Sequence, residues 1–405
     1  MAVGEPDAES AEGHRRVIAG VVIAGFCVFL QLYAPQPLLV LFRDTFHASE
    51  AQVSLIVSVA TLAVALASPF VGMLADAVGR KRVIVPCLFA LALATFGCAT
   101  ASNLHQLVVW RFVAGLCMPG VIAVTLAYIS EESPAASAGS VVAIYVTGTV
   151  LGGLTGRLSA AFVADRFSWR WSFAVLAFLT LVGAICTWRM LPRSRHFQRQ
   201  LHWHDGFSAL GRHLHNKRLL ATYFAGFSVL LSHVGLFTYI SFHLARPPFS
   251  LSTSALGMIF LVYGLGVIVT PLSGRLIDRL GHRAGAALSA GMFIAGAALT
   301  LIPNLPLMVM GIAIASSGVF VAQATSSSHI GRAADGAKSA ASGLYVAAYY
   351  LGGSMGATAL VVPWHLGGWP AVVGTIIVVQ CLCLVVSWKY YIHETRTSDV
   401  VVPVE

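Results

Sequence analysis

The sequence predicts an all-α membrane protein whose twelve transmembrane helices form two six-helix bundles related by internal duplication. Three observations support this prediction. First, 57% of the 405 residues are hydrophobic and only 10% are charged, whereas a soluble domain carries roughly 25% charged residues. Second, apolar runs of the ~20 residues that a membrane-spanning helix needs follow one another along the whole chain. Third, motifs of the first half return in the second half.

The predicted spans divide evenly between the two halves. Those of the first half cover residues 16–42, 51–71, 83–101, 105–128, 139–163 and 170–191. Those of the second half cover residues 218–244, 253–273, 285–302, 305–329, 339–362 and 371–392. We expect an N-terminal bundle at residues 14–191 and a C-terminal bundle at residues 218–393, joined by a cytoplasmic linker at residues 192–217. We also expect a disordered cytoplasmic tail at residues 1–13 and a second cytoplasmic tail at residues 394–405.

Two sets of motifs carry the repeat. The connection between the second and third spans contains Gly72, Asp76, Gly79, Arg80 and Lys81, and the matching connection of the second half contains Gly274, Asp278, Gly281 and Arg283. The fifth span contains Gly148, Gly152, Gly153 and Gly156, and the eleventh contains Gly352, Gly353 and Gly356. Parallel repeats of hydrophobic helices are typical of secondary transporters, which bind the solute between the repeats near the bilayer midplane.

The distribution of basic residues predicts the topology. With the N-terminus inside, 19 of the 25 Lys and Arg residues lie on the cytoplasmic side, four lie outside and two lie within helices. Cytoplasmic loops are enriched in Lys and Arg. We therefore expect both termini in the cytoplasm; the bacterial inner (plasma) membrane location that we expect follows from the family resemblance given below.

Other classes of protein fit less well. The formal charge of +9 comes from residues at helix ends, so we expect no nucleic-acid partner. We expect no cofactor and no enzyme, because neither an intramembrane carboxylate cluster nor a Walker-type loop is present. A receptor would need a soluble signalling domain. The linker pair His202 and His204 could bind a metal, but a solvated connector explains these residues better.

The motifs also resemble a known family. The run from Gly72 to Lys81 resembles the loop 2–3 motif of the major facilitator superfamily, and the run from Gly274 to Arg283 resembles its degenerate copy. The glycines from Gly148 to Gly156 resemble the helix 5 motif of the drug:proton antiporter subgroup, although Gly153 stands where that subgroup usually has Pro. Parts of the first and seventh spans resemble the YnfM-type bacterial members. The resemblance implies the fold of this family and a monomer.

The resemblance also implies roles for the repeated motifs. The loop 2–3 cluster would dock on the other half and act as a conformational latch of the outward-facing state. Its residues are Gly72, Asp76, Gly79, Arg80, Lys81, Gly274, Asp278, Gly281 and Arg283. The glycines of the fifth and eleventh spans would pack helices closely and help to gate the passage, two roles that the sequence does not separate.

Intramembrane polar residues are the candidates for the solute and proton cavity. Arg111 and Arg157 are costly in a membrane, and the second half has Gly311 and Ala357 in their places, so the scaffold does not require them. Gln31, Tyr33 and Gln36 replace the acidic residue that many cation exporters carry in the first span. His233 is the first candidate for proton coupling, and Asp44 is the second. Tyr239 and Gln323 complete the candidates.

The expected function is secondary active transport of a small molecule by alternating access, most simply export coupled to proton entry. Uptake with protons, or facilitated movement of a sugar-like or anionic solute, is the alternative. None of the sixteen Asp and Glu residues lies in the middle of a predicted span, which favours neutral or anionic solutes over cations. Expected partners are the solute, protons and the lipid bilayer.

Overall fold

The computed structural model of the chain describes residues 8–132, 135–192, 211–334 and 338–391. Within these ranges the chain forms helices and short connections, and no strand. The prediction of an all-α protein is therefore confirmed.

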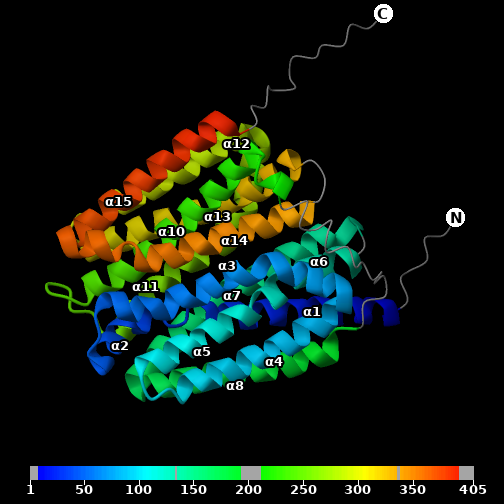
Figure 1. The fold of residues 1–405 in the computed structure, drawn as a ribbon, viewed down its shortest axis with the longest axis horizontal. Helices are drawn as coiled ribbons and strands as arrows, with labels where there is room; N and C mark the ends of the chain where they lie inside the picture. Colours follow the sequence, from blue (N-terminus) through cyan, green and yellow to red (C-terminus); the bar gives the residue numbers. More distant parts are fainter. Residues whose placement is uncertain (1–7, 133–134, 193–210, 335–337, 392–405) are drawn as a thin grey trace, which may run out of the picture.

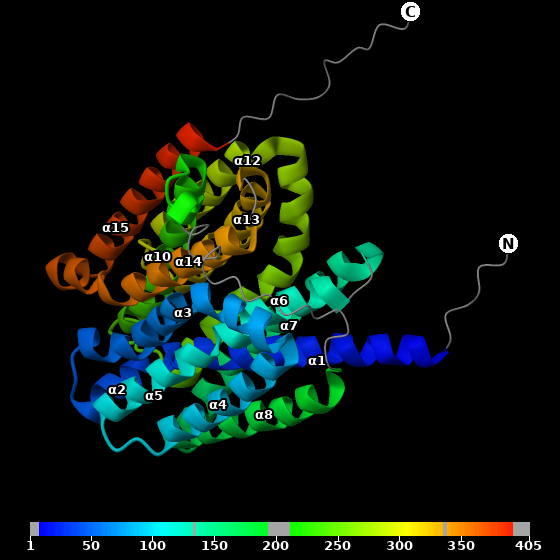
Figure 2. The same ribbon diagram turned by 45° about the vertical axis from the view of Figure 1, so that its right-hand side comes forward.

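The helices gather into two groups that follow the two halves of the chain, as both Figure 1 and the turned view of Figure 2 show. The first group comprises α1 (Ala8–Leu32), η1 (Gln36–Leu38), α2 (Leu39–Phe46), α3 (Glu50–Val78), α4 (Arg80–Ala99), α5 (Leu104–Cys117), α6 (Pro119–Glu132), α7 (Ala135–Arg166) and α8 (Trp169–Met190). The second group comprises α10 (Lys217–Leu244), α11 (Thr253–Ile259), η2 (Phe260–Leu265), α12 (Gly266–Leu299), α13 (Leu305–Ala333), α14 (Lys338–Thr358) and α15 (Val361–Tyr390).

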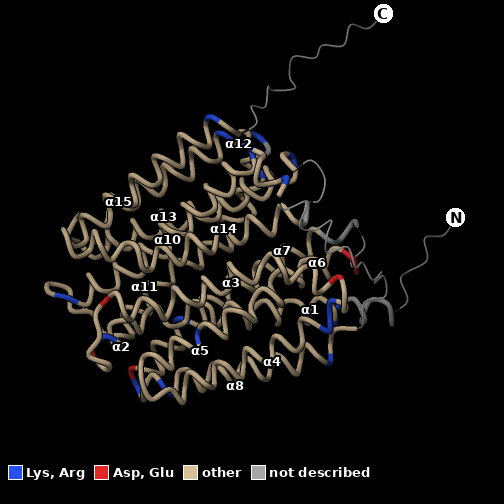
Figure 3. Tube along the Cα trace, viewed as in Figure 1, with Lys and Arg blue, Asp and Glu red and all other residues tan. Residues whose placement is uncertain are grey.

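The long helices run between two ends of the molecule. The short helix α2 lies at one end, and α6 reaches the other, where α1 also begins and α15 also finishes (Figure 1). We call these ends the α2 end and the α6 end. The acidic residues in the described part of the chain, red in Figure 3, lie close to one end or the other.

Ten helical segments of the described chain are long and apolar enough to cross a membrane, by length and composition. Two of the twelve predicted spans are not among them. The run 285–302 begins in the part of α12 that follows a kink at Gly281, where the backbone has φ 80° and ψ 168°. The run 339–362 falls largely in α14, which is rich in Gly, Ser, Ala and Tyr. The count of twelve stays a prediction.

Two of the predicted spans are interrupted by 3₁₀ segments. Pro35 and Pro37 flank Gln36 and break the first span into α1, η1 and α2, because proline lacks the N–H that continues a helix. The span 253–273 is interrupted by η2. Both 3₁₀ segments contact α7. Discontinuous helices near the middle of a membrane protein commonly border a binding site.

Small residues bring two pairs of helices into close contact. At Gly152 and Gly156 of α7, an added Cβ would collide with backbone carbonyl oxygens of α1. At Gly352 and Gly356 of α14, it would collide with backbone carbonyl oxygens of α10. The same packing device thus recurs once in each group, in agreement with the close helix contact that small residues allow in membranes.

The two groups meet along α3 and α14. The hydroxyl oxygens of Ser58 and Ser354 lie 2.8 Å apart at this contact, as a buried hydrogen bond. On the outside of the molecule, large apolar side chains such as Leu93, Phe178 and Val385 are exposed. An apolar surface of this extent fits a hydrocarbon solvent better than water.

Candidate functional site

Arg157 lies where α7 of the first group meets η2 of the second group, beside the contact of α3 with α14. It is carried by α7, and only 1% of its surface is exposed. Its Nε donates a hydrogen bond to Oε1 of Gln36 at 3.0 Å, and its Nη1 donates to the carbonyl oxygen of Gly153 at 2.9 Å. Both acceptors belong to the first group and neither carries a charge.

Aromatic rings from both groups surround this guanidinium. Its central carbon lies 5.0 Å from the ring centroid of Tyr33, 5.1 Å from that of Phe260 and 4.9 Å from that of Tyr263. Tyr33 precedes η1, whereas Phe260 and Tyr263 belong to η2. The interrupted helices of both groups therefore place flat, electron-rich faces around one cation, which stabilises it by cation–π attraction.

His233 of α10 lies beside this cluster. Its ring packs against Phe237 with centroids 4.9 Å apart and against Tyr263 with centroids 5.8 Å apart. Among the described residues, both ring nitrogens of His233, the hydroxyl of Tyr33 and Nε2 of Gln36 are buried without a hydrogen-bond partner. Burying an unsatisfied polar group costs about 1–3 kcal/mol. These atoms therefore suit a bound polar ligand. Together, Tyr33, Gln36, Arg157, His233, Phe260 and Tyr263 are called the Arg157 site below.

Arg111, the other intramembrane arginine, has a different environment. It is equally buried, at 1% exposed. Its Nε, Nη1 and Nη2 donate to the backbone carbonyl oxygens of Ile56, Gln31 and Leu32 at 3.2, 3.0 and 2.6 Å. Those carbonyls belong to α3 and α1, so the guanidinium joins three helices of the first group. This geometry suits a structural clamp.

The remaining cavity candidates lie apart from the Arg157 site. Nε2 of Gln31 donates to Oγ1 of Thr180 at 2.6 Å, which joins α1 to α8. The hydroxyl of Tyr239 donates to the carbonyl oxygen of Ala357 at 3.0 Å, which joins α10 to α14. Gln323 of α13 is exposed. The structure thus brings together Tyr33, Gln36, Arg157 and His233 and separates them from the other candidates.

The glycines also differ in their positions. Gly152, Gly156, Gly352 and Gly356 pack helices within one group. A Cβ at Gly148 would collide with the side chain of Val22 of α1, and one at Gly353 with that of Leu230 of α10. Gly153 instead borders the Arg157 site, because a Cβ there would lie 3.2 Å from Nη1 of Arg157 and 3.7 Å from the ring of Tyr263.

The predicted latch residues lie at the α6 end. Nη2 of Arg80 is 2.6 Å from Oδ1 of Asp76 and 2.6 Å from Oε1 of Glu131, so the arginine pairs with two carboxylates of its own group. Nζ of Lys81 donates to the carbonyl oxygen of Leu191.

The conformations of the latch glycines agree with two sharp turns. Gly79 has φ 100° and Gly281 has φ 80°, values that residues other than glycine rarely adopt. A Cβ at Gly72 or Gly274 would have no neighbour within 4 Å. In the second group, Nε of Arg283 donates to the carbonyl oxygen of Tyr391 at 3.0 Å, and the side chain of Asp278 lies outside the described part of the structure.

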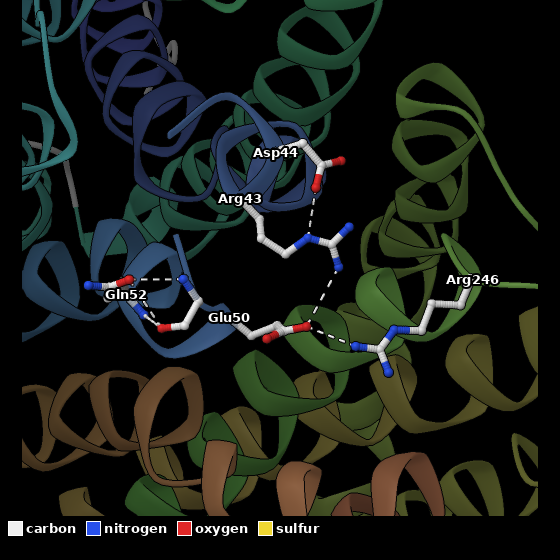
Figure 4. Close-up of polar contacts among 6 residues, drawn as sticks. Arg43, Asp44, Glu50, Gln52 and Arg246 are labelled. Carbon is white, nitrogen blue, oxygen red and sulfur yellow. Dashed lines mark hydrogen bonds and ion pairs between the residues drawn. The ribbon is translucent and has the colours of Figure 1, made fainter. Parts of the chain in front are cut away.

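At the α2 end, an ion-pair network joins the two groups (Figure 4). Oε1 of Glu50, the first residue of α3, is 2.9 Å from Nη2 of Arg246, which follows α10. The same carboxylate oxygen is 3.6 Å from Nη1 of Arg43. Arg43 also pairs with Asp44 at 2.9 Å. Glu50 therefore bridges the groups, whereas the described ion pair of Asp44 stays within the first group.

A second polar contact joins the two groups at the α2 end. The hydroxyl of Ser254 in α11 donates to Oδ2 of Asp165 in α7 at 2.7 Å. At the α2 end, two polar contacts therefore join the first group to the second. Asp44 also lies at this end, beside Arg43 (Figure 4), and the linker pair His202 and His204 lies outside the described residues.

Comparison with known proteins identifies close relatives. A sequence model described as the Major Facilitator Superfamily matches residues 21–357 and 248–402. The inner membrane transport protein YnfM of Escherichia coli (strain K12) is 32% identical over 93% of this chain and 90% of its own length. The MFS-type transporter YybF of Bacillus subtilis (strain 168) is 31% identical over 95% of each chain.

The fold has solved counterparts as well. A bacterial homologue of the human lysosomal transporter Spinster, solved in an inward-facing and unoccupied conformation, superposes with a TM-score of 0.73 over 97% of this chain and all of that one. The sequence identity is 15%, so this likeness concerns the fold.

Proposed function

Because the chain belongs to the Major Facilitator Superfamily and is a membrane transporter, we propose that it moves a small solute by alternating access around the Arg157 site. In this proposal twelve spans form two duplicated six-helix bundles, at residues 14–191 and 218–393. The bundles rock against each other and expose the site to one side of the membrane at a time. The protein works as a monomer in the bacterial inner membrane, with both termini in the cytoplasm and no nucleic-acid partner.

One observation carries this proposal. The guanidinium of Arg157 contacts rings from both groups, at 5.0 Å for Tyr33 and 4.9 Å for Tyr263. A movement of one bundle against the other must change these contacts. A solute that replaces them would favour one arrangement over the other, which is the differential binding that drives a conformational change.

The positions of the polar contacts support a proposal for the conformational state of this structure. Glu50 with Arg246 and Asp165 with Ser254 join the groups at the α2 end. With that end on the outer side, the structure represents a protein closed to the outside. The cluster of Asp76, Arg80 and the residues repeated in the second half would latch the opposite, outward-facing state.

We further propose that transport is export coupled to proton entry. His233 is the proton carrier that the geometry favours, since it is buried beside the Arg157 site and has no hydrogen-bond partner among the residues described. Asp44 is the second candidate. Proton symport and facilitated movement of a sugar-like or anionic solute are the alternatives.

The test is a pH trace in proteoliposomes of the purified protein, with a panel of neutral, anionic and cationic solutes. Export by exchange predicts that protons move opposite to the solute, and protein-free liposomes give the background. Proton movement in the same direction would replace exchange by symport. Solute flux without proton movement would leave a facilitator, and the absence of any solute flux would refute the transport proposal.

A pair of histidine variants tests the proton carrier. His233→Asn should retain exchange of labelled for unlabelled solute but lose the response to a pH gradient, because the amide cannot titrate. His243→Asn is the matched control. His243 lies on the same helix, with its ring stacked on Trp369 at 5.7 Å. Equal loss of the pH response in both variants would remove the special role of His233.

A further inference from the structure

The net charge of the Arg157 site is not balanced by protein groups. Among the residues that the structure describes, no carboxylate pairs with Arg157, and the two acceptors of its hydrogen bonds are neutral. A buried cation without a counter-ion costs several kcal/mol. An anion that entered the site would remove this cost, whereas a cation would increase it.

The other buried arginine, Arg111, is compensated by backbone groups, so the fold does not leave every buried arginine without compensation. Three of its N–H groups, one on each guanidinium nitrogen, point at backbone carbonyl oxygens, whose dipoles replace a counter-ion. At Arg157 the described hydrogen bonds come from Nε and Nη1, and that of Nη1 stays within its own helix. One edge of this guanidinium therefore retains hydrogen-bonding capacity.

Further donors lie around this edge. The hydroxyl of Tyr33 and Nε2 of Gln36 are buried without a described acceptor. Each belongs to a side chain that already contacts Arg157, through the ring in one case and through Oε1 in the other. A guanidinium with adjacent O–H and N–H donors matches the two oxygens of a carboxylate, which arginine binds in bidentate fashion.

The walls of the site have the opposite character. Phe237 and Phe260 stack with centroids 4.7 Å apart, and Tyr263 lies 5.3 Å from Phe320. With His233 they form a continuous set of ring faces next to the cation. Flat apolar surfaces of this kind favour a flat apolar ligand, because aromatic pairs gain stabilisation beyond the burial of their area.

We propose that the transported solute is an organic anion that joins one carboxylate to a planar, largely apolar body. The carboxylate is bound by Arg157, with Tyr33 and Gln36 as additional donors, and the body lies against Phe260 and Tyr263. This inference rests on the proposed function, since it names the class of solute for that site.

Binding of benzoate to the purified full chain in lipid nanodiscs tests the inference, with calorimetry as the readout. Benzamide is the neutral analogue of the same shape, benzylamine is the cationic one, and acetate lacks the ring. Benzoate is expected to bind more tightly than each of them, by roughly tenfold or more over benzamide, because a hydrogen bond to a charged group is worth about 1.5–3 kcal/mol. Equal affinity for benzoate and benzamide would overturn the proposal.

Variants show whether Arg157 is the anchor. Arg157→Gln should weaken benzoate binding by about 10- to 100-fold and weaken benzamide binding much less, because benzamide has no charge to pair with the guanidinium. Arg157→Lys keeps the charge but not the bidentate geometry, so it should bind at an intermediate level. Tyr33→Phe removes a single donor and should weaken benzoate binding by a few-fold. The control is Arg170→Gln, because Arg170 also lies over a ring, that of Trp169 at 4.2 Å, but away from the site.

The outcomes separate this inference from the proposed function. If Arg157→Gln does not fold, Arg157→Lys and Tyr33→Phe still decide the role of the site. Unchanged benzoate affinity in all folded variants would overturn the inference. Transport of neutral or cationic solutes without benzoate binding would also overturn it while leaving the transporter intact. Benzoate binding without solute flux would contradict the transport proposal alone.

Discussion

Replacement of Glu50 by Gln is expected to shift the protein away from the state closed at the α2 end. The Glu50–Arg246 pair joins the two groups at 2.9 Å, and it must separate when that end opens. Glu50 also contacts Arg43 and is the first residue of α3, and both of these interactions lie within the first group. They therefore contribute equally in both states, and only the contact with Arg246 changes the equilibrium.

The size of the effect follows from burial. The side chain of Glu50 is 13% exposed and that of Arg246 is 51% exposed, so solvent and salt screen the pair. An exposed pair of this kind contributes about 0.2–1 kcal/mol. Near the upper end of that range the ratio of open to closed molecules rises about fivefold, so an open state of about 10% would reach roughly 40%.

Pulsed electron paramagnetic resonance can measure this shift. Spin labels at positions 167 and 366, both at exposed side chains, would report the separation of the groups at the α2 end. Asp44→Asn is the matched control, because Asp44 is 61% exposed and pairs with Arg43 of its own group. An unchanged distance distribution in Glu50→Gln, or the same shift in both variants, would refute the argument that the pair holds this end closed.

Three further predictions concern residues within one group. Arg111→Ala should lower the stability by about 3 kcal/mol, seen as a lower apparent Tm; loss of transport at an unchanged Tm would contradict the clamp. Gly156→Ala should destabilise the protein by about 1–3 kcal/mol. The control Gly374→Ala should have little effect, because a Cβ there has no neighbour within 4 Å. Equal Tm values for the two variants would disprove close packing at Gly156. Asp76→Asn should cripple transport at nearly unchanged Tm, because Arg80 keeps its pair with Glu131; full transport by this variant would refute the latch.

Much of the fold could be predicted from the sequence for a simple physical reason. The composition of a helix shows whether it lies in lipid or in water. Composition can be read from each stretch of the sequence without knowing its neighbours in the fold. The helical fold, the family and the transporter class are confirmed, and the boundaries of most apolar runs agree with the helices found. The interruptions at η1 and η2 were not predicted, although Pro35 and Pro37 were a visible signal for the first.

The candidate site required the tertiary structure. By sequence, Arg111 and Arg157 are alike, since both are intramembrane and both lack a counterpart in the second half. Gln31 and Gln36 are equally alike, yet five positions on a helix turn the side chain by roughly 140°, and the break at Pro35 changes the direction again. Gln31 therefore faces α8, and Gln36 faces Arg157.

The sequence by itself determined that this chain is a helical membrane protein, that motifs of its first half recur in the second half, and that the apolar runs hold two arginines and no acidic residue. Only the tertiary structure decided that Arg157 lies between the groups and that Phe260 and Tyr263 surround it. It also decided that Glu50 pairs with Arg246. These contacts join residues about 100 to 200 positions apart, and they depend on which helix faces meet. That choice results from close packing of whole helices, which no local pattern of residues encodes.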